Sequence, residues 1–136
     1  MSVVVLRAFS PVFDVESFLQ GFPNIDTDVV WRRGEKERSQ VLEDSGFSMT
    51  LADAETSAEA LSMARQELEA LTPMLDGLRR QAVFCLVDIS VFVGSERQFT
   101  NGVELSPGDL AWFAERGLGF AVSAYPVSDE EEEEDA

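Results

Sequence analysis

The sequence predicts an α+β fold in which an antiparallel sheet carries its helices on one face. A β-branched run at residues 2 to 9 and strict alternation at residues 46 to 52 are typical of strands. Apolar residues at intervals of three and four between Leu61 and Leu78 are typical of a helix that packs through one side. The elements follow the order β-α-β-β-α-β, which favours a ferredoxin-like first half followed by an α-β extension.

The first half consists of short elements separated by turn-forming residues. After the first strand, Asp14 is the expected N-cap of a short helix that ends at Gly21. The segment DVVWRR, residues 28 to 33, predicts a second strand, and a polar, charged loop is expected over residues 34 to 45. The strand at residues 46 to 52 is expected to be half-buried. Its polar side carries Ser48 and Thr50, and its apolar side carries Phe47, Met49 and Leu51.

A long helix is expected to begin after an N-cap at Thr56 or Ser57. Its apolar stripe keeps its phase throughout, so one side of the helix should cover the sheet. Pro73 lies inside the pattern and predicts a kink, with Thr72 as the cap of the second piece. The stripe consists of Leu61, Ala64, Leu68, Leu71, Leu75 and Leu78.

The last part of the chain predicts a central strand, a helix and a closing strand. Residues 82 to 93 alternate between an apolar face and a second face that is apolar at its ends and polar around Asp88. Ser106 as N-cap and Pro107 at the first helical position indicate where the helix begins. Its expected buried residues are Leu110, Phe113 and Ala114, and those of the closing strand at 118 to 126 are Leu118, Phe120, Val122 and Ala124.

Four segments form a recognisable series along the chain. They are WRRGE at 31 to 35, GFSMTL at 46 to 51, LTPMLDGLR at 71 to 79 and ELSPGDLAWFAERGLGFAVSAY at 104 to 125. In this order they resemble the mostly bacterial family catalogued as domain of unknown function 4279, over roughly residues 3 to 125. The chain departs from the family pattern at Gly46-Phe47-Ser48, where members often have Gly-Leu-Trp. The resemblance implies no activity, because none is assigned to the family.

Length and charge limit the classes of function. The chain has 136 residues, which predicts a single α+β domain over residues 1 to 127. Residues 128 to 136 are expected to be a disordered acidic tail, which either keeps the protein soluble or binds a basic partner. The net charge is −16, and without the seven acids at 129 to 135 there remain 19 acids against 10 bases, a net charge of −9. A surface this acidic repels nucleic acid, so no nucleic-acid partner is expected.

The sequence also predicts where the protein is found. It contains no run of apolar residues long enough for a membrane helix, and its start lacks the basic region of a signal peptide. Its single cysteine, Cys85, excludes an internal disulfide and fits a reducing compartment. We therefore expect a cytoplasmic protein with no membrane contact.

Few residues of this chain can support catalysis. It has no histidine, so imidazole-dependent triads and metal sites are absent, and Cys85 lies in an apolar strand typical of a core residue. Asp88 lies within an apolar strand, and we expect it to pair with Arg7 or to face solvent rather than to act as a general acid or base. We expect no enzyme activity, no cofactor and no bound metal.

The strongest local feature is a cluster of basic residues in an acidic chain. Residues Trp31, Arg32, Arg33 and Gly34 are the candidate binding site, because arginine forks bind phosphate or carboxylate and a tryptophan can stack on a ligand. The alternative is structural: Trp31 packs inward, Arg32 faces solvent, and the basic residues at 36 to 38 pair with nearby acids. We favour this second interpretation, in which the basic side chains orient a loop.

These observations predict a small acidic protein-interaction module. An immunity protein that binds and blocks a toxin is one such module, because an acidic surface complements a basic enzyme and speeds its capture. We therefore expect a basic protein partner. The alternative is a ligand-binding or regulatory module that recognises a small anion near Trp31 to Arg33.

Overall fold

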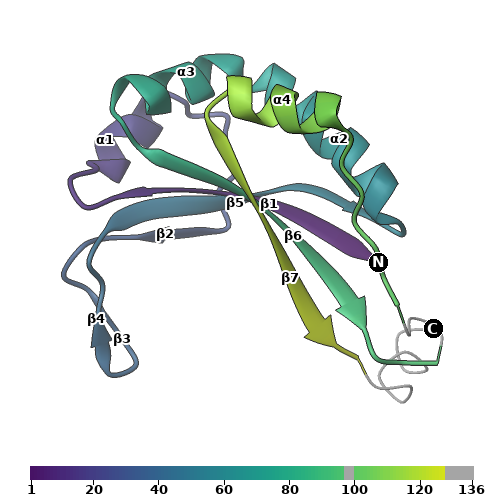
Figure 1. The fold of residues 1–136 in the computed structure, drawn as a ribbon. Helices are drawn as coiled ribbons and strands as arrows, with labels where there is room; N and C mark the ends of the chain where they lie inside the picture. Colours follow the sequence, from purple (N-terminus) through teal and green to yellow (C-terminus); the bar gives the residue numbers. More distant parts are fainter. Residues whose placement is uncertain (97–99, 128–136) are drawn as a thin grey trace.

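The computed structural model describes residues 1–96 and 100–127 of the chain. The acidic tail predicted at residues 128 to 136 lies outside this part. Within it the elements are, in chain order, β1 (Ser2–Ser10), α1 (Val15–Gln20), β2 (Val29–Trp31), β3 (Lys36–Glu37), β4 (Gln40–Val41), β5 (Ser45–Ala54), α2 (Ser57–Ala70), α3 (Thr72–Arg80), β6 (Phe84–Val93), α4 (Pro107–Glu115) and β7 (Leu118–Pro126) (Figure 1).

Five strands form one sheet in the order β2-β5-β1-β6-β7. The central strand β1 pairs antiparallel with β5 and with β6, and β2 pairs antiparallel with β5. The α+β class is therefore confirmed. The prediction of a fully antiparallel sheet is wrong for β7, which runs parallel to β6. The chain returns to the starting end of β6 through α4 and its connections, so β7 begins at the same end of the sheet as β6. The ferredoxin-like first half is not confirmed, since both neighbours of β1 are antiparallel to it.

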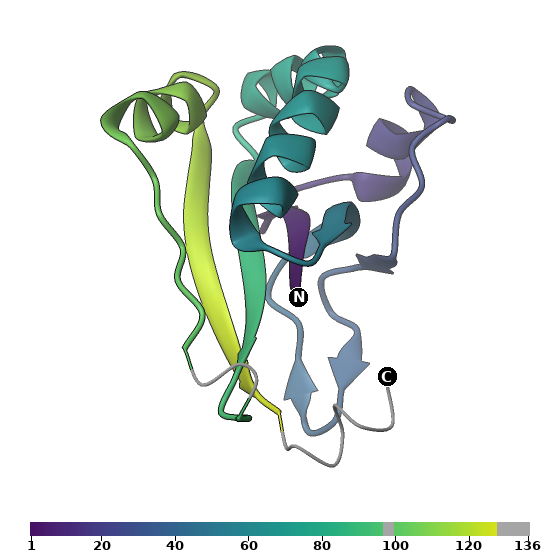
Figure 2. The same ribbon diagram turned by 90° about the vertical axis from the view of Figure 1, so that its right-hand side faces the viewer.

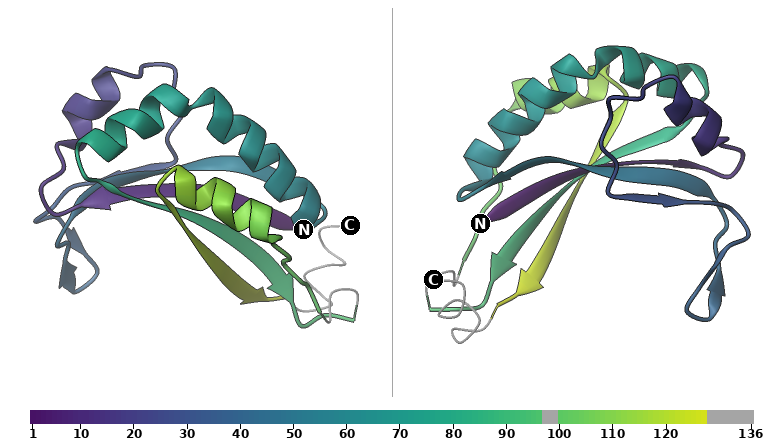
Figure 3. Two further views of the ribbon diagram at one scale, coloured as in Figure 1. Left: turned by 45° about the horizontal axis from the view of Figure 1, so that its top comes forward. Right: turned by 180° about the vertical axis from the view of Figure 1, so that it is seen from behind.

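The helices lie together on one side of the sheet (Figures 1 and 3). The sheet is curved, and its concave side faces away from the helices (Figure 1). The apolar core fills the space between the helices and the sheet, and it is one cluster of buried side chains. From β1 it includes Val4, Leu6 and Ala8, and from β6 it includes Cys85, Val87, Ile89 and Val91. None of the helices in residues 1–96 and 100–127 lies over the opposite side of the sheet (Figure 2).

The predicted long helix is divided into α2 and α3. Thr56 caps α2 as expected, since its hydroxyl accepts a hydrogen bond from the backbone N–H of Glu59 at 3.2 Å. Pro73 lies in the first turn of α3, where no N–H is needed. Thr72 does not cap this helix, because its hydroxyl donates to the carbonyl of Glu69 instead. The common stripe is confirmed, with Leu61, Ala64, Leu68, Leu75 and Leu78 buried and Leu71 half-buried.

The loop predicted at residues 34 to 45 contains a β-hairpin. Lys36 pairs with Val41, and Glu37 pairs with Gln40. The turn between them places Arg38 at a φ of 58°, in the left-handed region. An Asn-Gly or Asp-Gly pair usually marks such a turn, and neither occurs in this segment. The hairpin projects from the edge of the main sheet on its open side (Figure 1).

The burial predicted for the last helix and strand is partly wrong. Phe113 and Leu118 are buried, whereas Leu110 and Val122 are each 52% exposed. The capping box at Ser106 confirms the predicted start of α4. However, α4 and β7 lie at the margin of the structure, so a smaller part of each is covered (Figure 2). Ala114 and Ala124 are also exposed, and Phe120 is half-buried.

The structure also bears on membrane insertion. Within residues 1–96 and 100–127, each helix is too short or too polar to cross a bilayer.

Candidate interaction surface

We define the open face as the side of the main sheet opposite the helices. Because successive strand residues point to opposite faces, the pairing register identifies its members. They are Val3, Val5, Arg7 and Phe9 of β1, Val29 and Trp31 of β2, Gly46, Ser48 and Thr50 of β5, Phe84, Leu86, Asp88, Ser90 and Phe92 of β6, and Gly119, Ala121, Ser123 and Tyr125 of β7.

The open face is rich in apolar and aromatic side chains. Val29, Phe84 and Tyr125 are 55%, 51% and 46% exposed. Phe84 makes an edge contact with Phe9 at a ring-centroid distance of 5.3 Å, and Tyr125 packs on Phe92 at 5.8 Å. These pairs lie at opposite ends of β6 and line the two ends of the face. Exposing apolar side chains of this kind to water is unfavourable.

An ion pair occupies the middle of the open face. The guanidinium of Arg7 lies 2.9 Å from the carboxylate of Asp88 on the adjacent strand. Ser123 donates its hydroxyl to the same carboxylate at 2.9 Å from the other side. Asp88 is thereby 98% buried without being left unpaired, and the predicted pairing with Arg7 is confirmed.

Further carboxylates lie along the β2–β5 side of the face. Asp28 accepts a hydrogen bond from the hydroxyl of Thr50 at 2.7 Å, and Asp53 lies exposed opposite Val3. At the β2 edge, Asp44 accepts a hydrogen bond from the indole N–H of Trp31 at 2.9 Å. The open face therefore combines apolar side chains with carboxylates along one side, at β2 and β5.

Trp31 belongs to the open face and not to the core. Its strand neighbour Val30 packs against the core, so the indole lies on the opposite side. There it covers Gly46, where a Cβ would lie 2.7 Å from the indole ring. The prediction that Trp31 packs inward is wrong, because in this short strand Val30 is the residue that points toward the core and its neighbour Trp31 points away from it.

The other residues of the candidate site at Trp31–Gly34 are held by neighbours. Arg32 forms an ion pair with Glu16 of α1 and a second one with Glu35 at 3.7 Å. The hydrogen bond and charge of Glu16 raise the pKa of the Arg32 guanidinium, which stays protonated. Arg33 donates its backbone N–H to Ser45 at 2.8 Å, and its guanidinium reaches the carbonyl of Pro11 at 3.5 Å.

Gly34 completes this corner at a φ of 92°, a conformation that favours glycine. Its N–H donates to the carbonyl of Leu42 at 2.9 Å, which fixes the base of the β3–β4 hairpin. The corner thus joins α1, β2 and the hairpin. These contacts favour an orienting role for Arg32 and Gly34 over the recognition of an anion, since Arg32 already contacts two carboxylates.

The predicted pairing of Lys36 and Arg38 is wrong. Within the described part of the chain, neither residue has a carboxylate in ion-pair contact. Their side chains are exposed, and the nearby Asp44 contacts Trp31 instead. Two exposed strands of two residues each do not hold the charges close together.

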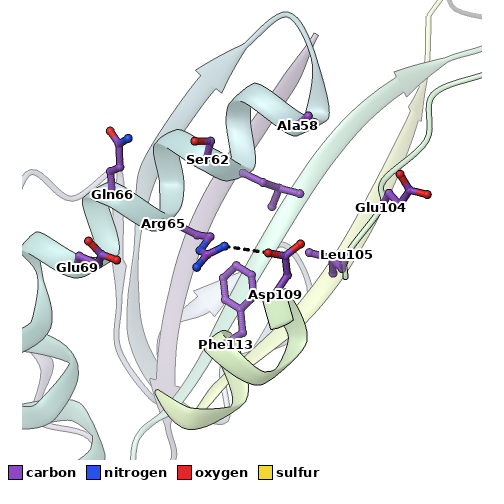
Figure 4. Close-up of a pocket in the computed structure, with 10 residues that line it drawn as sticks. Ala58, Ser62, Arg65, Gln66, Glu69, Glu104, Leu105, Asp109 and Phe113 are labelled. Atoms are coloured by element: carbon purple, nitrogen blue, oxygen red, sulfur yellow. Dashed lines mark hydrogen bonds and ion pairs between the residues drawn. The ribbon is translucent and has the colours of Figure 1, made fainter. Parts of the chain in front are cut away.

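A groove of about 340 Å³ lies between α2 and α4 on the helical side (Figure 4). Arg65 of α2 and Asp109 of α4 form an ion pair of 2.8 Å across it. The backbone N–H of Ser106 lowers the pKa of the Asp109 carboxyl, and Arg65 adds to this effect. The guanidinium of Arg65 also lies 4.7 Å from the centre of the Trp112 ring, and that of Arg116 lies at 3.8 Å. The two contacts of Arg65 fasten α4 to α2, whereas Arg116 packs on a residue of its own helix end.

Cys85 is buried in the core as predicted, and burial raises the pKa of its thiol to about 11. In residues 1–96 and 100–127, His, Cys, Asp and Glu side chains form no group of three that could hold a metal ion.

Sequence reasoning expected one face of the sheet to carry the helices but missed the other face as a candidate interaction surface. A signal was present in the first strand, where Val3 and Val5 are apolar at positions that alternate with Val4 and Leu6. A strand that is covered on one side only usually carries polar residues at alternate positions. Apolar residues on both faces of this strand therefore indicated that the face without helices could be a binding surface.

Comparisons of the chain with protein-family models, with curated proteins and with solved structures give no match. The resemblance to domain of unknown function 4279 stays a prediction.

Proposed function

We propose that this chain is a small acidic protein-interaction module that binds a basic protein through the open face. The observation that carries this proposal is a sheet face with exposed apolar and aromatic side chains and with carboxylates along its β2–β5 side. None of the helices in residues 1–96 and 100–127 covers this face (Figure 1). Exposed apolar patches bordered by polar groups are typical of interfaces. Aromatic side chains are enriched in such interfaces, and Phe84 and Tyr125 supply them here.

Charge selects the partner. The net charge of −16 attracts basic proteins over distances on the order of a Debye length, about 8 Å at physiological salt. At the face itself, Asp28 and Asp53 lie beside apolar side chains. Lysine and arginine match this combination, because their stems are apolar and their heads are charged.

We further propose that the module is an immunity protein, which blocks a basic toxin enzyme by occupying its surface. Such a protein needs fast capture of its target and no chemistry of its own, and electrostatic steering supplies the fast capture. The single cysteine suits a reducing compartment, so we propose the cytoplasm as its location.

The test compares two valines at opposite edges of the sheet. Val29 is 55% exposed on the open face, and Val122 is 52% exposed on the helical side. A partner is captured from an extract of the source cell with the wild-type chain, identified and purified. Its association and dissociation rates are then measured with the wild type, Val29→Lys and Val122→Lys at two salt concentrations.

The proposal expects one basic partner that binds the wild type and Val122→Lys alike and binds Val29→Lys at least tenfold more weakly. Higher salt should slow association more than it speeds dissociation. Capture of no protein contradicts the proposal. So does a partner whose affinity falls with Val122→Lys and is unchanged by Val29→Lys.

A further inference from the structure

β7 is a long edge strand without charge. Its nine residues, LGFAVSAYP, include no acidic or basic side chain, in a chain with 36 charged residues. One edge of β7 pairs with β6, and no other strand of residues 1–96 and 100–127 pairs with its outer edge (Figure 2). Proteins usually protect such edges with charges, bulges or very short strands. Pro126 does so only at the far end of β7.

We infer that β7 pairs with the β7 of a second copy of this chain, antiparallel and centred on Val122. A closed homodimer uses the same surface on both copies, so the side chains of β7 must fit against those of a second β7 that runs in the opposite direction. Val122 is the middle residue of the nine, and in this register it faces the partner's Val122. The two sheets then form one continuous sheet.

The register places large side chains opposite small ones on both faces. On the helical side, Phe120 lies opposite the partner's Ala124. On the open face, Gly119 lies opposite the partner's Tyr125, beside the exposed ring of Phe84. Directly opposite residues in an antiparallel pair have Cβ atoms about 4.5–5.5 Å apart, so a tyrosine ring can cover a glycine there. Val122, at 52% exposure, packs against the partner's Val122.

The inference does not rest on the proposed function, and the same two valines separate them. Sedimentation equilibrium of the full chain should give a dimer of the 15.0 kDa protein. Val122→Lys should weaken the dimer at least tenfold, because two like charges would face each other across the twofold axis. Val29→Lys, on the opposite edge strand, should leave it unchanged.

Cross-linking tests the register itself. Val122→Cys should form an intermolecular disulfide in mild oxidant, because facing residues in an antiparallel pair have Cα atoms about 4.5–5.5 Å apart, within the range that a disulfide bridges. Cys85 is buried and does not compete. Val29→Cys is the control and should stay uncross-linked. A wild type that remains monomeric up to its solubility limit overturns the inference, and so does a dimer that Val122→Cys fails to cross-link.

Discussion

The Arg7 guanidinium lies 2.9 Å from the Asp88 carboxylate and joins β1 to β6 at the centre of the open face. The two differ in their access to water, since the side chain of Asp88 is 3% exposed and the side chain of Arg7 is 42% exposed. A buried carboxylate depends on its partners, whereas a half-exposed guanidinium can be hydrated when its partner is removed. Removal of Arg7 and removal of the Asp88 charge should therefore lower the stability of the protein by different amounts.

Arg7→Met is expected to destabilise the protein more than Asp88→Asn. The first change leaves a buried carboxylate with only the hydroxyl of Ser123, at a cost of about 3 kcal/mol. The second leaves a neutral amide that still accepts hydrogen bonds, at a cost of about 1 kcal/mol. Urea denaturation of both variants at neutral pH measures the difference. Equal losses of unfolding free energy in the two variants would contradict the argument that the buried carboxylate depends more on its partner than the half-exposed guanidinium does.

Leu68→Ala is expected to lower the free energy of unfolding by about 2 to 5 kcal/mol, because it opens a cavity at a position with 0% exposure. Two controls lie on the same helix. Glu67→Ala removes an exposed charge, and Met63→Ala removes an apolar side chain that is 47% exposed. Each should change the unfolding free energy by less than about 0.5 kcal/mol. A comparable loss in Met63→Ala would contradict the assigned face of α2.

Features that depend on local periodicity could be predicted from the sequence. The helical stripe from Leu61 to Leu78 and the caps at Thr56 and Ser106 follow from spacing and side-chain chemistry alone. The Arg7–Asp88 pair was also predictable, because a carboxylate within an apolar strand requires a partner and few basic residues were available.

Features that depend on the position of an element within the whole fold could not be predicted. Val122 and Leu110 follow the correct periodicity for burial, but β7 is an edge strand and α4 lies beside it at the margin of the structure (Figure 2), so both side chains remain exposed. Trp31 has the right residue type for a core, but β2 has only three residues and its phase is set by its pairing with β5. The parallel direction of β7 likewise follows from the path of the chain over the sheet.

Gly46→Ala is expected to destabilise the protein strongly. A Cβ at this position would lie 2.3 Å from the carbonyl oxygen of Ala8 and 2.7 Å from the Trp31 ring. The ring could rotate away, but the carbonyl belongs to the β1–β5 ladder and can move only with the strand. The expected loss is about 3 kcal/mol, at the upper end of the usual range for overpacked sites.

The control for this prediction is Gly102→Ala, where a Cβ meets no atom within 4 Å. Its melting temperature should remain close to that of the wild type. Trp31→Ala combined with Gly46→Ala should recover only part of the loss, because the contact with the backbone of Ala8 remains. Full recovery in the double variant would show that the indole alone requires the glycine.

Cys85 predicts how stability changes at alkaline pH. Burial raises the pKa of its thiol from 9.0 to about 11, so the unfolded chain loses the proton before the folded chain does. This contribution to stability is fully present below the unfolded pKa and is lost as the pH rises through the folded value. Each unit of pKa difference corresponds to about 1.4 kcal/mol, so the loss between about pH 8 and pH 10.5 is roughly 2 kcal/mol.

Cys85→Ala isolates this effect, because it removes the thiol and leaves every other titrating group in place. At about pH 8 the variant is less stable than the wild type, since it lacks a buried side chain that contacts the core. As the pH rises to about 10.5, the gap in unfolding free energy between the two proteins should narrow by roughly 2 kcal/mol. Urea denaturation under reducing conditions at both pH values measures the gap. A gap that stays constant would mean that the thiol ionises as readily in the folded protein as in the unfolded chain.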